Sequence, residues 1–247
     1  MIQLCRQLEG LPLAVELAAV RMRVMTAQQL LVRLDDRFRL LRTQSPVAVD
    51  RQKTLQALID WSYELCSPQE RALWQRLSVF AGGCTLDAAE RVCVGDPIAP
   101  EDTLDAMTGL VLKSIMRHEL HDGVDRYAML ETLRQYGRDR LAASGQERRL
   151  RRRHGEWCRG LALRAEAEWF GEQQLDWAFR LRSEQPNLSA ALEFCQDEPG
   201  EASTALEIAA ALWSHRMSWR SPSEGHQRLA RALALARSPG AVRAKAL

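Results

Sequence analysis

The sequence predicts a mainly α-helical protein with one β-hairpin, and three observations lead to this prediction. Apolar residues recur at helical spacing over most of the 247 residues. The β signal is concentrated in one stretch, where Asp122-Gly123 separates two strand-like segments, 113–120 and 124–129. Helices are predicted before and after this hairpin, which is the winged-helix pattern. The expected fold class is therefore a helical subdomain, a winged helix and an α-solenoid of tetratricopeptide-like helices.

The composition fits a soluble globular protein. Hydrophobic residues make up 46% and charged residues 27%, and a net charge of +2 implies no polyanionic partner for the chain as a whole. No apolar run is long enough to span a bilayer, and no secretory signal begins the chain. The six cysteines form no CxxC pair, so we expect buried thiols in the reducing cytoplasm. Because the chain starts and stops inside helical patterns, we expect a longer parent protein.

The first predicted unit, residues 1–42, is helical. Pro12 begins a helix that is apolar around nearly its whole circumference, so we expect that helix to be buried. Thr26 and Gln29 form a capping box for a second helix. A linker over residues 43–51 is expected to follow.

The second predicted unit, residues 54–145, is the winged helix. Ser67, Pro68 and Glu70 predict a helix start, with a cap, a proline at the first position and a glutamate at the third. From Lys113 onward, apolar and charged residues alternate, so we expect the first strand to be half-buried. The last helix of this unit carries an apolar stripe and ends at a glycine cap. That stripe consists of Leu130, Leu133, Gly137 and Leu141.

The third predicted unit, residues 154–247, is helical throughout. Gly and Pro residues punctuate it, and Pro186 is expected to separate a helix over 173–182 from another over 186–196. Paired helices of this length indicate an α-solenoid of tetratricopeptide type. The basic run before this unit, residues 148–153, could hold phosphates, but we favour a solvated helix face between domains.

Few patterns point to chemistry. Residues 30–36, LLVRLDD, imitate an apolar strand that ends in two acids, but the preceding capping box favours the surface of a helix. A zinc site can be imagined from four side chains, although their spacing matches no compact zinc module. These are Cys84, Cys93, His118 and His121. No phosphate loop or hydrolase motif is present, and no nucleophile lies beside a base. We therefore expect no catalysis, no metal and no cofactor in this chain.

Three stretches together resemble one family. Residues 10–14, GLPLA, are similar to the motif of that name in STAND-type (NB-ARC) signalling ATPases. Residues 58–93 and 126–145 resemble the winged-helix part of bacterial relatives, which are large transcriptional regulators of the LuxR and SARP type with a central ATPase. The resemblance covers nearly the whole chain, from the last helical ATPase subdomain into the tetratricopeptide-like sensor.

The resemblance implies roles for two positions. Pro12 would pack on the adenine base. Residues 129–131 align with a Met-His-Asp motif whose histidine contacts the nucleotide phosphate; Leu130 replaces that histidine and cannot donate a hydrogen bond. The phosphate loop and magnesium-binding acids would precede residue 1, so ATP or ADP is implied only for a longer parent. The implied partners are an upstream nucleotide-binding domain and a protein or small-molecule effector on the helical repeats.

Two functions fit these expectations. The first is a non-catalytic switch, in which the winged helix holds the nucleotide-binding unit closed until a signal on the repeats releases it. The alternative is a DNA-binding transcription factor that uses its own winged helix. The helix that would read DNA, within 100–114, carries Glu101, Asp102 and Asp105, with Lys113 as its single base. Because three acids repel the phosphate backbone, we expect no specific DNA binding by this segment.

Overall fold

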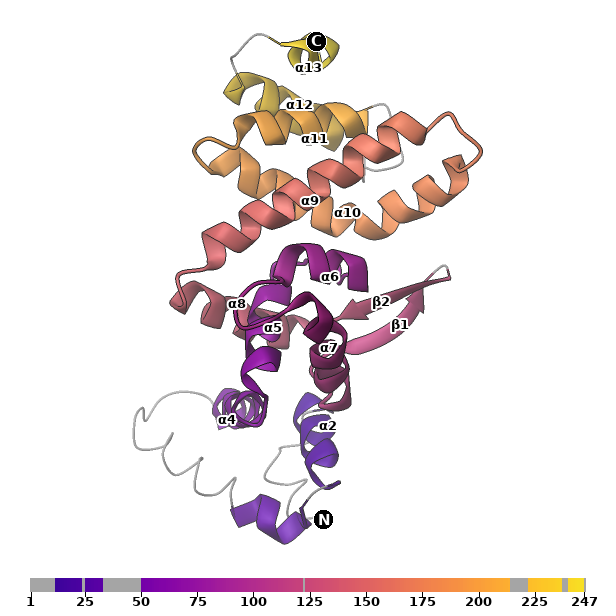
Figure 1. The fold of residues 1–247 in the computed structure, drawn as a ribbon. Helices are drawn as coiled ribbons and strands as arrows, with labels where there is room; N and C mark the ends of the chain where they lie inside the picture. Colours follow the sequence, from indigo (N-terminus) through magenta and orange to yellow (C-terminus); the bar gives the residue numbers. More distant parts are fainter. Residues whose placement is uncertain are drawn as a thin grey trace.

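The computed structural model shows stacked helices and a single hairpin over the part of the chain that it describes (Figure 1). It describes residues 12–23, 25–32, 50–121, 123–213, 222–236 and 240–246. The elements of the first two units are α2 (Pro12–Arg21), α4 (Asp50–Glu64), α5 (Pro68–Leu77), α6 (Leu86–Cys93), η1 (Pro100–Asp102), α7 (Thr103–Leu112), β1 (Arg117–His121), β2 (Val124–Ala128) and α8 (Glu131–Ala143). Those of the third are α9 (Glu147–Glu168), α10 (Gln174–Asp197), α11 (Ala202–Trp213), α12 (Pro222–Leu235) and α13 (Ala241–Ala246).

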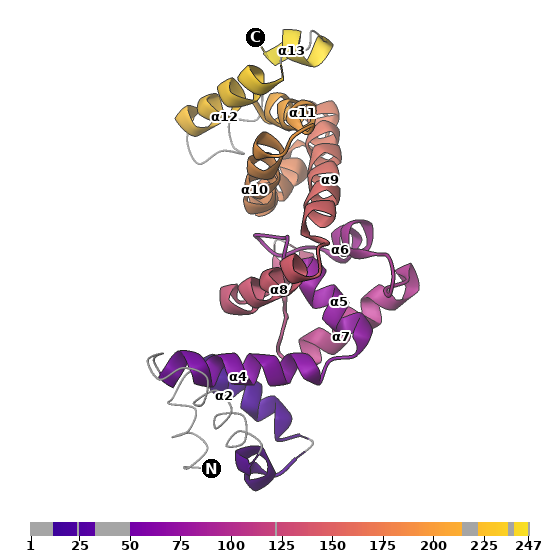
Figure 2. The same cartoon turned by 90° about the vertical axis from the view of Figure 1, so that its left-hand side faces the viewer.

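These elements form three tiers, which Figure 2 separates most clearly. Helices α2 and α4 lie at the end near the N-terminus, the winged-helix elements α5 to α8 lie in the middle, and α9 to α13 lie beyond them. One cluster of buried apolar side chains runs through all three tiers. The expected mainly helical fold with one hairpin is confirmed.

In the first tier, the capping box at Thr26 is confirmed. The backbone N–H of Gln29 donates to the Thr26 hydroxyl at 3.2 Å, and the Gln29 side chain accepts from the Thr26 N–H at 2.9 Å. Residues 27–32 are helical, as favoured for the start of the LLVRLDD stretch. The predicted helix before residue 10 and residues 43–49 of the predicted linker lie outside the described residues. Residues 50 and 51, also predicted as linker, belong to α4 instead, because this helix begins before the expected position.

The caps and glycines of the winged helix behave as their local sequence predicts. Ser67 and Glu70 form the complete capping box at the start of α5. Helix α8 crosses α5 at Gly137, where an added Cβ would lie only 3.0 Å from the carbonyl oxygen of Trp74. The indole N–H of Trp74 donates to the carbonyl oxygen of Leu133 at 2.9 Å, which fixes this crossing. The glycine cap after α8 is confirmed, since Gly145 has a φ of 72°.

The first strand differs from its prediction in two ways. It begins at Arg117 rather than Lys113, because Ser114 adopts a φ of 55° and the next two N–H groups fold back onto the Leu110 carbonyl oxygen. All five residues of β1 are exposed, and Leu120 is 71% exposed. The expectation of a half-buried strand is therefore wrong. Because the hairpin reaches out past the helices, its own face has little to pack against (Figure 1).

The third tier corrects two boundaries. Helix α9 begins at Glu147, so the basic run forms its first turns instead of preceding it. The predicted break at Pro186 is absent, because α10 runs unbroken from Gln174 to Asp197 with this proline inside it. A proline inside a helix removes one backbone hydrogen bond, and contacts with the winged helix compensate for it here. Figure 1 shows α9 and α10 as a pair that α11 and α12 extend.

Candidate functional site

The candidate site is the junction between the winged helix and the first two helices of the third tier. Its centre is a salt bridge between Arg126 of β2 and Glu184 of α10, with Nη1 and Oε1 2.5 Å apart. The Arg126 guanidinium also donates to the carbonyl oxygens of Gly82 and Gly83. Both side chains are nearly fully buried, and each charge has a partner of opposite sign. The salt bridge therefore joins the wing to α10.

Asn187 completes this junction from the next turn of α10. Its side-chain oxygen accepts the backbone N–H groups of Ala81 and Gly82, and its amide donates to Gly83 at 2.9 Å and to Glu184 at 2.6 Å. Pro186 packs on the same turn: a Cβ on Gly82 would lie 3.0 Å from its ring. Residues 81–83 thus form a socket for the turn of α10 that contains Pro186.

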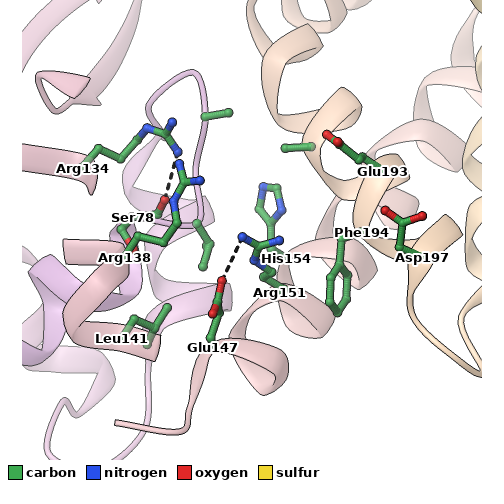
Figure 3. Close-up of a pocket in the computed structure, with 13 residues that line it drawn as sticks. Ser78, Arg134, Arg138, Leu141, Glu147, Arg151, His154, Glu193, Phe194 and Asp197 are labelled. Carbon is green, nitrogen blue, oxygen red and sulfur yellow. Dashed lines mark hydrogen bonds and ion pairs between the residues drawn. The ribbon is translucent and has the colours of Figure 1, made fainter. Parts of the chain in front are cut away.

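A cavity of about 410 Å³ opens beside this junction (Figure 3). Arg134 and Arg138 line it from α8, while Glu193 and Asp197 line it from α10. Within the described residues, Arg138 makes no hydrogen bond or ion pair. Arg134, by contrast, donates two hydrogen bonds to the Glu131 carboxylate and one to the Ser78 carbonyl oxygen. The cavity thus has basic side chains on its α8 wall and acidic side chains on its α10 wall.

His154 of α9 lies between these walls and is fully buried. Its ring meets Phe80 edge-on, with centroids 4.9 Å apart. Burial, together with the nearby Arg151, lowers the pKa of His154 from 6.5 to about 4, so the ring is neutral at physiological pH. This residue therefore packs between the winged helix and α9.

The imagined zinc ligands do not converge. Cys84 and Cys93 are buried in the core, where burial raises the pKa of each thiol. His118 is exposed on the hairpin and contacts Asp125 at 2.7 Å. Within the described ranges, no three His, Cys, Asp or Glu side chains are placed to hold a metal ion.

The surface that would read DNA is poor in the required side chains. The exposed positions of α7 include Leu104, Asp105, Thr108 and Leu112. Lys113, the single base of this segment, is engaged with Glu70, its Nζ lying 2.5 Å from the carboxylate. This face offers no arginine, asparagine or glutamine that could reach a base edge.

Most of the basic run is also engaged. Arg148 and Arg152 pair with Glu198, and Arg152 also pairs with Glu201 at 2.5 Å. Arg153 donates to backbone carbonyl oxygens of the winged helix. Arg148 and Arg152 thus make contacts within the third tier and remain exposed, while Arg153 joins α9 to the winged helix.

The two positions singled out by resemblance lie apart from the junction. Pro12 begins α2, and its side chain is outside what the structure describes. Leu130 is the N-cap residue of α8 and is partly buried against the core. The junction residues Glu184 and Asn187 had not been predicted from the sequence. The only signal in the sequence for this junction was the polar residue Asn187 directly after Pro186, where a helix break was expected.

Comparison with known proteins agrees with this geometry. Residues 66–142 match the family model described as "Winged helix-turn-helix domain". These residues form a winged helix-turn-helix domain. Among solved structures, none matches the chain. None of the described helices has the length and hydrophobicity needed to cross a bilayer.

Mycobacterial proteins are similar over much of the chain. A Mycobacterium bovis protein named "Putative HTH-type transcriptional regulator Mb0914c" is 39% identical over 210 residues, which are 85% of this chain and 24% of that protein. A Mycobacterium tuberculosis protein named "Uncharacterized protein Rv0894" is 41% identical over 145 residues, which are 58% of this chain and 37% of that protein. The chain thus spans about a quarter of the length of the first relative and somewhat more than a third of the second.

Proposed function

We propose that this chain is the regulatory portion of a bacterial transcriptional regulator, in which the winged helix contacts protein rather than DNA. The names of its relatives support the regulatory role, and the domain match supports the winged helix. One observation carries the proposal. Lys113 at the end of α7 and Arg126 of the wing are both bound to carboxylates inside the protein, and the exposed Arg117 of the wing lies 3.7 Å from Glu119.

The free face of α7 is suited to a protein partner. Leu104 is 48% exposed and Leu112 is 60% exposed. They are eight positions apart in the sequence, so they lie on the same side of the helix. Asp105 adds negative charge beside them. An apolar face with an acidic edge resembles the centre and rim of a protein interface, whereas DNA requires a basic surface.

The finer proposal is a STAND-type switch. The partner of the winged helix is then an upstream nucleotide-binding domain in the longer protein, and ATP or ADP is its ligand. In this switch Pro12 packs on the adenine base of the nucleotide. Because Leu130 replaces the histidine of related proteins, the winged helix makes no hydrogen bond to the nucleotide phosphate at that position. An effector on the helical repeats shifts the switch through the Arg126–Glu184 junction. This chain itself contributes no catalytic residue.

A DNA titration tests the main proposal. The whole chain is titrated with random duplex DNA and with duplexes from its own promoter region, at low and at physiological salt. We expect weak binding, independent of sequence, that falls steeply as salt rises. Thr108→Glu, which adds a charge to the exposed face of α7, should change nothing.

The opposite outcome would support the second candidate, a DNA-binding transcription factor that uses its own winged helix. Sequence-selective binding that persists at physiological salt, and that Thr108→Glu abolishes, would place a bound duplex on α7. Arg182→Gln, a change at an exposed residue of α10, is the matched control.

A further inference from the structure

A groove of about 650 Å³ lies along α9 on its α6 side, apart from the cavity of Figure 3. Its basic and aromatic lining residues are Arg91, Arg149, Arg152, Arg153, Arg164 and Trp157. All of its positive charges are arginines, and Glu156 is its one acidic lining residue. The volume lies in the range of small-molecule sites.

The groove follows one stripe of α9. Positions 149, 153, 157, 160 and 164 are three or four residues apart, so their side chains share one face of the helix. Gly160 lies in this stripe between Trp157 and Arg164, and an added Cβ there would meet only the Arg164 guanidinium, at 3.8 Å. Arg164 thus folds back over an open floor, which a larger residue would fill.

Three of the five guanidinium charges are not neutralised by a carboxylate. Within the described residues, Arg149 and Arg164 form no ion pair, and Arg153 donates to the carbonyl oxygens of Arg91 and Val94 instead. Arg149 and Arg153 both approach Gly95, with guanidinium nitrogens 3.6 and 4.0 Å from the position that a Cβ there would take. Glu156 is engaged with Arg159 at 3.2 Å. The groove therefore carries a surplus of positive charge.

Trp157 is the aromatic residue in the lining of this groove. Its side chain is 7% exposed, and its indole N–H is buried without a hydrogen-bond acceptor. A buried donor left unsatisfied costs about 1 to 3 kcal/mol, so proteins rarely retain one without an acceptor nearby. Because this N–H is not exposed to solvent, an anion in the groove contacts the arginines rather than this donor.

We propose that this groove binds a small anion that carries two or more phosphate groups. Guanidinium groups match phosphate oxygens with paired, charge-assisted hydrogen bonds, and the exclusive use of arginine favours phosphate as the ligand. The ligand is small because the five arginines line a single groove of about 650 Å³.

This inference deepens the proposed function by naming the chemical class of an effector. It rests on that function only in treating the bound anion as a regulatory signal. Arg153 touches the bound anion and the C-terminal end of α6 at once, because its N–H groups reach Arg91 and Val94. A ligand in the groove therefore strengthens the hold of α9 on the winged helix.

Calorimetric titration of the whole chain with inorganic tripolyphosphate tests the site. Inorganic pyrophosphate, orthophosphate and sulfate at equal ionic strength are compared with it. We expect saturable binding at one site, with affinity falling from tripolyphosphate to pyrophosphate and little binding of the two single anions. Bound tripolyphosphate should also raise the melting temperature.

Two variants separate this site from general positive charge. Arg149→Gln/Arg164→Gln removes the two arginines without ion pairs and should weaken binding at least tenfold, whereas Arg182→Gln on α10 should leave it unchanged. Gly160→Leu keeps the charge but fills the floor, and it should also weaken binding severalfold. Its fold is protected, because a helical glycine in open space tolerates a side chain.

Absence of saturable tripolyphosphate binding would overturn the proposal. So would binding that survives both variants, or duplex DNA binding that requires Arg149 and Arg164 while tripolyphosphate fails to compete. Failure here leaves the proposed function intact, because that function is judged from promoter DNA and α7. Conversely, sequence-selective DNA binding through α7 would contradict the proposed function but not the anion site on α9.

Discussion

Arg126 on the wing and Glu184 on α10 form a salt bridge of 2.5 Å in which both side chains are buried. Removing one partner leaves the other charge buried without compensation, which typically costs about 3 to 5 kcal/mol. Glu184→Gln should therefore lower the free energy of unfolding by about 3 kcal/mol in denaturant melts of the whole chain. Because Gln keeps the size of Glu, the loss reports charge rather than packing.

A double-mutant cycle provides the control for that loss. Arg126→Met should also destabilise the chain, and the Arg126→Met/Glu184→Gln pair should lose less than the sum of the two single variants. Strictly additive losses would show that the two residues do not interact in solution.

Leu133 and Leu130 should respond differently to truncation. Leu133 is 1% exposed between α8 and α5, so Leu133→Ala should cost about 2 to 5 kcal/mol. Leu130, at the N-cap of α8, is only partly buried, and Leu130→Ala should cost clearly less. Chemical denaturation of both variants measures the difference, and equal losses would contradict the placement of the apolar stripe.

Two helical glycines should give opposite results with alanine. At Gly137 a methyl group would press on Trp74, so Gly137→Ala should destabilise the chain by about 1 to 3 kcal/mol. At Gly160 there is space, and Gly160→Ala should stabilise it by about 0.5 to 1 kcal/mol through helix propensity. Melting temperatures that move in the same direction for both variants would be inconsistent with the described crossing of α5 and α8.

His154 should make stability depend on pH. Its pKa is lowered from 6.5 to about 4 by burial, so the unfolded chain binds a proton more readily than the folded one between these values. The contribution is fully present above pH 6.5 and is lost as the pH falls toward 4, by up to about 3 kcal/mol.

The matched variant for this titration is His154→Leu. It lacks the titrating ring, so its stability should decline less than that of the wild type between pH 6.5 and 4.5. Parallel pH profiles for the two proteins would show that other groups cause the decline.

Local chemistry made some elements predictable. The capping boxes at Thr26 and Ser67 and the turn glycine Gly145 each depend on residues within three or four positions, and all three were predicted correctly. Gly123 in the hairpin turn has a φ of 78°, as its Asp-Gly sequence indicates, while Asp122 lies outside the described residues.

The junction was not predictable in this way. Pro186 looks like a helix break until Gly82, more than a hundred positions earlier, is placed against its ring. The exposure of β1 likewise depends on how far the hairpin extends beyond the helices, which an alternating pattern cannot reveal. Contacts of this kind are decided by tertiary packing, which overrides local preference.

The hydrogen bond from Asn187 to Gly83 joins residues 104 positions apart. During synthesis the winged helix is therefore complete long before α10 can cover its socket, and Arg126 faces water in the interval. A fragment that ends at Gly145 lacks α10, so Arg126 stays exposed without Glu184. The wing of that fragment therefore carries one more unpaired positive charge than the wing of the whole chain. Nucleic-acid affinities measured on such a fragment will overstate those of the intact protein.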